Sequence, residues 1–191
     1  ATIVGGRANT ALVEDSTVVG GNSHNAAGDS STIGGGFRNS ALGEFSLIGG
    51  GSYNVAMSTW STIVGGFSNV NDGYQGVIGG GAANSAGSLY TCVVGGNANT
   101  VTAQYATIAG GYTNTAAATY ATVSGGITNK AQNSYSVVSG GRTNSASSTY
   151  AVVVGGSFNK ARATASVVGG GYYNTNDALR GVIGGGWTNN A

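Results

Sequence analysis

Residues 121–135 read ATVSGGITNKAQNSY and residues 136–150 read SVVSGGRTNSASSTY, so two adjacent segments match position by position. Their Gly-Gly pair recurs every 15 residues from Gly5-Gly6 to Gly185-Gly186, without insertion or deletion. A period that holds over 13 copies indicates a repeat architecture and excludes a disordered low-complexity tract. We number the positions of the repeat 1 to 15, with Ala1 at position 1 of the first copy.

Each position of the repeat has its own chemistry. Position 3 is Val or Ile in every copy, position 1 is small, and position 9 is Asn in 12 of 13 copies, with His24 as the exception. Position 11 is Ala in 10 copies, and the departures are Asn71, Val101 and Asn176. A period of 15 residues is too short for a repeat of two helices, and it fits one coil of a β-solenoid.

The repeat therefore predicts an all-β fold, a β-solenoid that forms a single repeat domain of about thirteen coils over residues 1–191. Positions 1–4 are rich in Val, Ile and Thr and predict one strand, and positions 8–11 predict a second. The Gly-Gly pair predicts a corner that needs positive φ or a close backbone approach, and positions 12–15 predict the return turn. Successive coils then stack about 4.8 Å apart in parallel register.

The asparagine at position 9 has two structural interpretations. Its side chain could form an amide ladder along the stack, with each side chain bonding to the next. Alternatively, asparagine could be there because it tolerates a left-handed backbone. The sequence leaves both interpretations open.

Composition excludes several classes of protein. The 191 residues include 37 Gly but no Pro, which excludes collagen, and a single Cys excludes an intramolecular disulfide framework. Only 7% of residues are charged, the net charge is +1 and no basic cluster occurs, so we expect no nucleic-acid partner. No apolar run approaches the roughly 18 residues of a membrane span, and we expect no cofactor.

Charged residues avoid most positions of the repeat. Positions 1 to 6 carry none in any copy, and positions 2 and 4 hold mainly Thr, Val, Gly, Ala and Ser. If position 3 points into the core of a lone solenoid, positions 2 and 4 point toward solvent and should be polar. Because they are largely apolar or small, the first strand is predicted to be covered on both faces. An identical chain is the simplest second cover, which predicts a homo-oligomer, with a trimer favoured. The predicted oligomer core comprises Ile33, Ile48, Ile63, Ile78, Val93, Ile108 and Val123.

The pattern small-x-Ile/Val-x-Gly-Gly-x-x-Asn-x-Ala resembles the head repeat of trimeric autotransporter adhesins, and related repeats occur in bacteriophage tail fibres and bacterial surface proteins. It is clear in Ser61-Thr62-Ile63-Val64-Gly65, which Asn69 follows. The resemblance implies a left-handed parallel β-roll, three chains side by side, and a surface fibre that binds matrix or host receptors. The chain differs from that family in its 15-residue period, its doubled glycine and its asparagine in place of a small residue.

Aromatic residues recur at position 15, which makes this column the main candidate for a binding surface. Its clearest members are Tyr90, Tyr105, Tyr120, Tyr135 and Tyr150. Rings near 5 Å apart could stack, and such a strip could bind carbohydrate or another fibre. The alternative, which we favour, is that the column packs over the edge of the solenoid or into a seam between chains.

The remaining chemically notable residues have structural interpretations. His24 replaces the asparagine of position 9, and Cys92 occupies a position otherwise held by Thr, Val or Leu, so neither predicts a nucleophile or a metal ligand. Glu14, Asp29 and Glu44 share position 14 in consecutive coils and could hold Ca²⁺ weakly. A solvated acidic edge is the favoured interpretation, and we predict no metal site.

These observations predict a structural and adhesive fibre without enzymatic activity, located outside the cell, on the cell surface or on a virion. Identical chains are the expected partners, with a host receptor, matrix or glycan as a further one, and we expect the chain to be a segment of a longer fibre. A phage tail-fibre shaft is one alternative. An ice-binding β-roll is another, although Leu47, Val77 and Cys92 interrupt the threonines of position 2.

Overall fold

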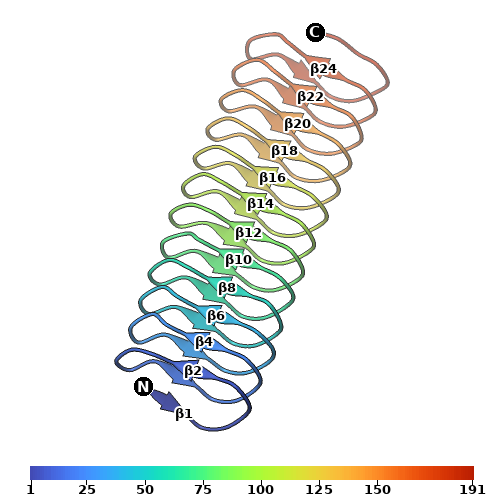
Figure 1. Ribbon diagram of the computed structural model, residues 1–191. Helices are drawn as coiled ribbons and strands as arrows, with labels where there is room; N and C mark the ends of the chain where they lie inside the picture. The colour runs from blue at the N-terminus through green and yellow to red at the C-terminus, as the bar shows by residue number, and fades with distance from the viewer. The chain divides into compact units, whose positions relative to one another are not determined.

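The computed structural model describes residues 1–191 (Figure 1). Every complete coil carries two short strands, and each strand pairs in parallel with the equivalent strand of the next coil. Positions 2 and 3 form the first strand of the coil, and positions 10 and 11 form the second. The secondary structure is all-β, so the molecule has no helix that could cross a membrane. The chain divides into two compact units, Ala1–Asn97 and Ala98–Ala191, and we describe each by itself.

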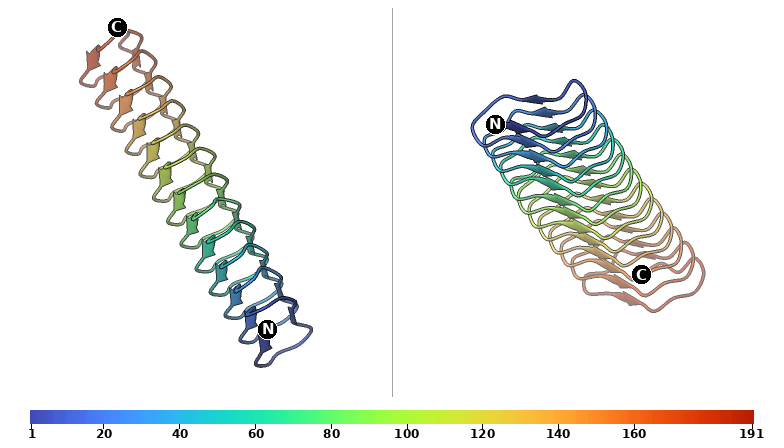
Figure 2. Two further views of the ribbon diagram at one scale, coloured as in Figure 1. Left: turned by 90° about the vertical axis from the view of Figure 1, so that its left-hand side faces the viewer. Right: turned by 90° about the horizontal axis from the view of Figure 1, so that it is seen from below.

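Unit 1, Ala1–Asn97, contains two parallel sheets on different sides of its coils (Figure 2). Its first sheet consists of β1 (Thr2–Ile3), β3 (Thr17–Val18), β5 (Thr32–Ile33), β7 (Leu47–Ile48), β9 (Thr62–Ile63), β11 (Val77–Ile78) and β13 (Cys92–Val93). Its second sheet consists of β2 (Thr10–Ala11), β4 (Asn25–Ala26), β6 (Ser40–Ala41), β8 (Val55–Ala56), β10 (Val70–Asn71) and β12 (Ser85–Ala86).

Unit 2, Ala98–Ala191, repeats this arrangement. Its first sheet consists of β15 (Thr107–Ile108), β17 (Thr122–Val123), β19 (Val137–Val138), β21 (Val152–Val153), β23 (Val167–Val168) and β25 (Val182–Ile183). Its second sheet consists of β14 (Thr100–Val101), β16 (Thr115–Ala116), β18 (Lys130–Ala131), β20 (Ser145–Ala146), β22 (Lys160–Ala161) and β24 (Thr175–Asn176).

Pairing along each sheet follows the 15-residue period. Ile33 pairs with Ile48, and Ala41 pairs with Ala56, both in parallel register. Each residue therefore lies against the residue at the same position of the next coil. This confirms the predicted parallel β-solenoid of 15-residue coils.

The core of a coil is narrow and comes from positions 1, 3, 9 and 11. In the coil that contains β7 and β8, Ser46, Ile48, Asn54 and Ala56 are all buried. The branched side chain at position 3 fills the space that the small residues at positions 1 and 11 leave between the sheets. Burial of one Val or Ile side chain contributes about 1.5–3 kcal/mol, and position 3 is buried in every coil after the first.

The glycine at position 6 makes the tight corner. Gly66 has a left-handed backbone (φ 97°), and a Cβ placed there would collide with the carbonyl oxygen of Gly81 in the next coil. Gly65, at position 5, has open space around it and no such backbone. The prediction of positive φ or close approach is therefore confirmed for position 6, whereas Gly65 shows neither feature.

The predicted second strand is too long, because the backbone at position 8 is left-handed. Thr128, at position 8, has φ 57°, and Tyr120, at position 15, has φ 59°. A residue in that conformation leaves the strand, so the strand shortens from positions 8–11 to 10–11. Position 7 instead forms parallel bridges between coils, as between Ile127 and Arg142, which the sequence did not predict.

The asparagines at position 9 form a ladder between coils, as the first interpretation predicts, but mainly through bonds from side chain to backbone rather than from one amide to the next. Asn54 donates from Nδ2 to the carbonyl oxygens of Gly50 (3.1 Å) and Gly66 (2.9 Å). Its Oδ1 accepts the backbone N–H of Asn69, the ladder residue of the next coil, at 3.0 Å. One buried amide thus satisfies three backbone groups, two carbonyl oxygens and one N–H, which explains why apolar residues do not occur at position 9.

Where position 11 is Asn instead of Ala, position 1 of the following coil is Gly. Asn71 is buried and donates to the carbonyl oxygens of Thr62 (3.0 Å) and Gly76 (2.7 Å). A Cβ at Gly76 would collide with Oδ1 of Asn71, and Gly181 stands in the same relation to Asn176. These two glycines are the only ones at position 1, so the substitutions at positions 11 and 1 occur as a pair.

Candidate functional site

Four of the predicted tyrosines form a stack at position 15 of unit 2. Successive ring centroids from Tyr105 through Tyr120 and Tyr135 to Tyr150 are 4.9, 5.0 and 4.9 Å apart, and neighbouring ring planes differ by 6–11°. Each ring therefore covers a face of its neighbour, and the inner rings leave mainly edges and hydroxyl groups to solvent. A sugar that stacks on a ring face has no place on Tyr120 or Tyr135.

Tyr90, in unit 1, contacts a second ring of its own unit. Its ring meets that of Tyr74 edge to face, with centroids 6.0 Å apart and planes at 87°. Phe45 and Trp60, also at position 15, stack at 4.3 Å. These contacts agree with the interpretation of the column as packing between coils, and a binding role for it stays a prediction.

The residues predicted to form an oligomer core lie inside their own chain. This group comprises Ile33, Ile48, Ile63, Ile78, Val93, Ile108 and Val123, and each is completely buried in the single chain. Because side chains alternate along a strand, position 3 points inward while positions 2 and 4 point outward. A second copy cannot reach position 3, so the surface available to it consists of positions 2 and 4.

The outer side of the first sheet in each unit is what we call the uncharged face. In unit 1 it consists of Thr2, Thr17, Thr32, Leu47, Thr62, Val77 and Cys92 at position 2, and Val4, Val19, Gly34, Gly49, Val64, Gly79 and Val94 at position 4. In unit 2 it consists of Thr107, Thr122, Val137, Val152, Val167 and Val182, with Ala109, Ser124, Ser139, Val154, Gly169 and Gly184.

Apolar side chains on the uncharged face are open to solvent in the single chain. Val64 is 60% exposed, Val94 57% and Val154 51%. No charged residue interrupts positions 2 and 4 in any coil. Exposed apolar side chains that gather on one face of a protein can mark an interaction surface.

The second sheet differs, because its outer side accepts charge. Lys130 and Lys160 are exposed at position 10. At position 12, Arg162 and Asp177 approach to 3.8 Å as an ion pair that is about half exposed. The two sheets of a coil therefore present surfaces of different chemistry.

His24 takes the place of a ladder asparagine, as the sequence predicts. It is buried, its Nδ1 accepts the backbone N–H of Asn39 at 3.1 Å, and its Nε2 has no hydrogen-bond partner. Burial lowers the pKa of His24, and the adjacent backbone groups of Gly36 and Asn39 oppose this shift only in part. The imidazole is held neutral within the coil, which suits a structural residue.

Cys92 and the acidic residues show no assembled chemical centre. Cys92 is half-buried on the uncharged face rather than in the core, and desolvation raises the pKa of its thiol. Glu14, Asp29 and Glu44 are exposed. No group of three or more His, Cys, Asp or Glu side chains lies close enough to hold a metal ion.

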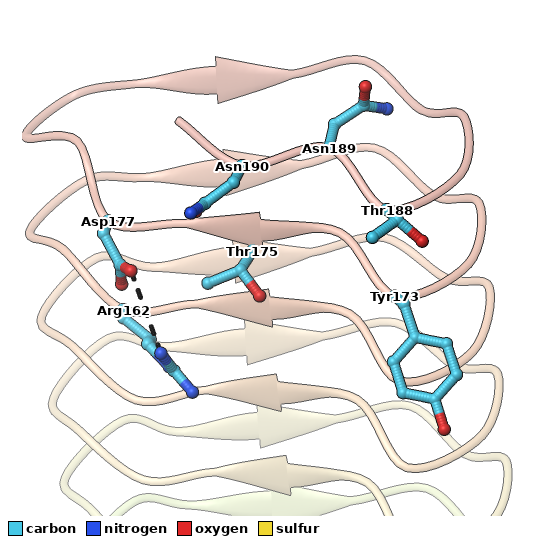
Figure 3. A pocket seen from close by; sticks show the side chains of 7 residues that line it. All are labelled: Arg162, Tyr173, Thr175, Asp177, Thr188, Asn189 and Asn190. Carbon is cyan, nitrogen blue, oxygen red and sulfur yellow. Dashed lines mark ion pairs between the residues drawn. The ribbon is translucent and has the colours of Figure 1, made fainter.

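A groove of about 250 Å³ lies on the outer side of the second sheet in unit 2 (Figure 3). Tyr173 and Thr188 at position 8 line one side, Arg162 and Asp177 at position 12 line the other, and Thr175 lies between them. Asn189 and Asn190 complete the lining. The groove was not predicted from the sequence, although large side chains at positions 8 and 12, on both sides of a smaller one at position 10, could have indicated it.

No protein-family model matches the chain, and neither does any of the curated proteins with which it was compared. Its function is therefore inferred from the repeat and from these surfaces.

Proposed function

We propose that the chain is the repeat segment of a structural, adhesive fibre outside the cell, without enzymatic activity, whose copies associate through the uncharged face. The observation that carries the proposal is the exposure of Val64, Val94 and Val154 on a sheet surface that lacks charge in every coil. Apolar surface removed from water contributes about 25 cal/mol per Å², so a repeated strip of this kind favours association.

The contrast with the second sheet supports a partner for the first. Lys130 and Lys160 occupy outward positions of the second sheet, so the coil tolerates charge on its surface. The absence of charge from positions 2 and 4 therefore has a cause other than folding of the coil. Contact with another chain is such a cause, because an unpaired charge buried in an interface costs several kcal/mol.

An identical chain is the partner that fits this face best. It carries the same uncharged face with the same 15-residue period, so every coil of one copy can meet an equivalent coil of the next. A closed trimer of left-handed β-rolls, the arrangement implied by the resemblance to trimeric autotransporter adhesins, would cover the face on all copies. The extracellular location and the binding of a receptor, matrix or glycan rest on the same resemblance.

The experiment places one lysine on either sheet. Val64→Lys adds a charge to the uncharged face, and Ser85→Lys adds the same charge at position 10 of the second sheet, where lysine occurs naturally. We expect Val64→Lys to reduce the mass measured by sedimentation to that of one chain, with an unchanged circular dichroism spectrum. Ser85→Lys should keep the mass of the unmodified protein. Equal masses for the two variants would contradict the proposal.

The ice-binding alternative has one specific observation in its favour. Thr2, Thr17 and Thr32 follow one another on the uncharged face of unit 1, which gives a short regular column of hydroxyl and methyl groups. Leu47 and Cys92 interrupt the column further along. A thermal-hysteresis measurement separates the two functions: a single-chain protein that halts ice growth would support ice binding and contradict the fibre.

A further inference from the structure

We infer that the groove beside Tyr173 binds a neutral pyranose sugar, with the sugar ring stacked on the open face of Tyr173 and its hydroxyl groups bonded to the polar lining. This site lies on the second sheet, and it is independent of the association proposed for the uncharged face. The groove contains the two components that a saccharide site needs, an aromatic side chain on one side and polar groups in the middle and on the other side (Figure 3).

One face of Tyr173 is covered and the other is open. Phe158, one coil earlier at position 8, stacks on Tyr173 with centroids 4.7 Å apart and planes within 7°. Tyr172 lies 4.5 Å from Tyr173 and 5.7 Å from Phe158, in both cases nearly perpendicular. These three distances place Tyr172 beside the stack rather than on the second face. The next residue at position 8 is Thr188, which is too small to cover a ring.

The open ring face distinguishes Tyr173 from the inner rings of the tyrosine stack. Tyr120 and Tyr135 each have a ring on both sides, about 5 Å away. Tyr173 is the last ring of its own stack and is 47% exposed. Apolar C–H groups on one side of a pyranose can contact such a ring face without displacing a neighbouring ring.

The polar lining suits hydroxyl groups and not a charged ligand. Asp177 offers acceptors, Arg162 offers donors, and Thr175 and Asn190 each offer both. The charges of Arg162 and Asp177 compensate each other across 3.8 Å, so the groove favours neither an anion nor a cation. A space of about 250 Å³ accommodates one sugar residue.

The test is saturation-transfer NMR and titration with the methyl pyranosides of glucose, galactose and mannose, and with methyl glucuronide as the anionic comparison. A ligand of this size in an open groove should bind with a Kd of about 1–10 mM. Tyr173→Thr should weaken binding about tenfold, and Asp177→Asn should do so to a similar extent. Thr is native to position 8 at Thr128 and Thr143, so the first variant should keep the fold, as circular dichroism will check.

Tyr53→Thr is the matched control, because Tyr53 is also at position 8 and contacts Phe37 and Phe67 edge to face. Binding of a neutral pyranoside that Tyr173→Thr and Asp177→Asn weaken, and that Tyr53→Thr leaves unchanged, supports the site. Absence of binding by all three neutral pyranosides overturns it. So does binding of methyl glucuronide alone, or binding that Tyr173→Thr does not change.

Discussion

Replacement of His24 by asparagine should stabilise the protein, because His24 is the one imperfect member of the position 9 ladder. The imidazole accepts a single backbone hydrogen bond, at Nδ1, and leaves Nε2 buried without a partner. An asparagine there can donate to the carbonyl oxygens of Gly20 and Gly36, which are the equivalents of the ladder contacts in other coils. It also keeps an acceptor for the N–H of Asn39.

The magnitude follows from the adjacent coil. Asn39 donates to Gly35 (3.0 Å) and Gly51 (2.9 Å) and accepts from Asn54 (3.0 Å), which is two hydrogen bonds more than His24 makes. At about 1 kcal/mol for each added bond, the expected gain from His24→Asn is about 2 kcal/mol. For a chain of this length that corresponds to a rise in Tm of about 4–8 °C.

The gain should grow as the pH falls. Burial lowers the pKa of His24 below 6.5, so under mildly acidic conditions the unfolded chain binds a proton that the folded chain does not. The folded state of the unmodified protein is therefore fully stable with respect to this group above pH 6.5 and loses stability as the pH falls below it. Asparagine does not titrate, so the variant lacks this loss.

Thermal unfolding followed by circular dichroism, well above and well below pH 6.5, measures both effects. The reverse substitution Asn114→His is the control, since Asn114 makes the complete set of ladder contacts, and it should lower Tm and introduce acid sensitivity. A His24→Asn variant that melts at or below the temperature of the unmodified protein at both pH values would refute the reasoning.

Three further predictions concern other positions of the repeat, each measured by chemical denaturation. Gly110→Ala should raise the free energy of unfolding by about 0.5 kcal/mol, since the site has open space. Gly111→Ala should lower it by more than about 4 kcal/mol, because the added Cβ would collide with the next coil. Equal effects of the two substitutions would contradict the corner geometry. Asn71→Ala and Gly76→Ser should each lower the free energy of unfolding by about 2 kcal/mol, but the double variant should recover most of that loss. A double variant whose loss equals the sum of the two single losses would refute the coupling. Tyr120→Ala should cost about 1–3 kcal/mol through two lost ring stacks, and an unchanged midpoint would contradict them.

Most of the fold could be predicted because every position repeats at one fixed interval. Val or Ile at position 3 of every coil requires parallel register, since any other pairing would expose part of that column. The requirement for glycine at position 6 could also be predicted, because no other residue recurs in so tight a corner. These features depend on periodicity alone.

The left-handed residues at positions 8 and 15 could not be predicted, because the residues found there do not favour positive φ. Tyr120 is held in that conformation by a hydrogen bond from its N–H to the carbonyl oxygen of Gln104 in the preceding coil, at 3.1 Å. Such a bond depends on the stacked structure and leaves no local sequence signal. By contrast, the coupling of Asn71 with Gly76 is visible in the sequence, because the two coils with Asn at position 11 are the two that are followed by Gly at position 1.

The candidate surfaces were only partly predictable. The sequence identified the tyrosine column, but the orientation of its rings, which decides whether a ligand can stack on them, depends on side-chain geometry. The lack of charge at positions 2 and 4 was visible, whereas the assignment of Ile63 and its equivalents to an interface failed. Enclosure of Ile63 by the second sheet of its own coil is a property of the folded chain.

The mass of the unmodified protein in solution tests the central claim most directly, because we propose that a second copy covers the uncharged face of the first sheet. We predict a mass that is a multiple of the 18.6 kDa chain, with three chains as the favoured number. A mass of one chain, maintained as the protein concentration is raised, would contradict the account.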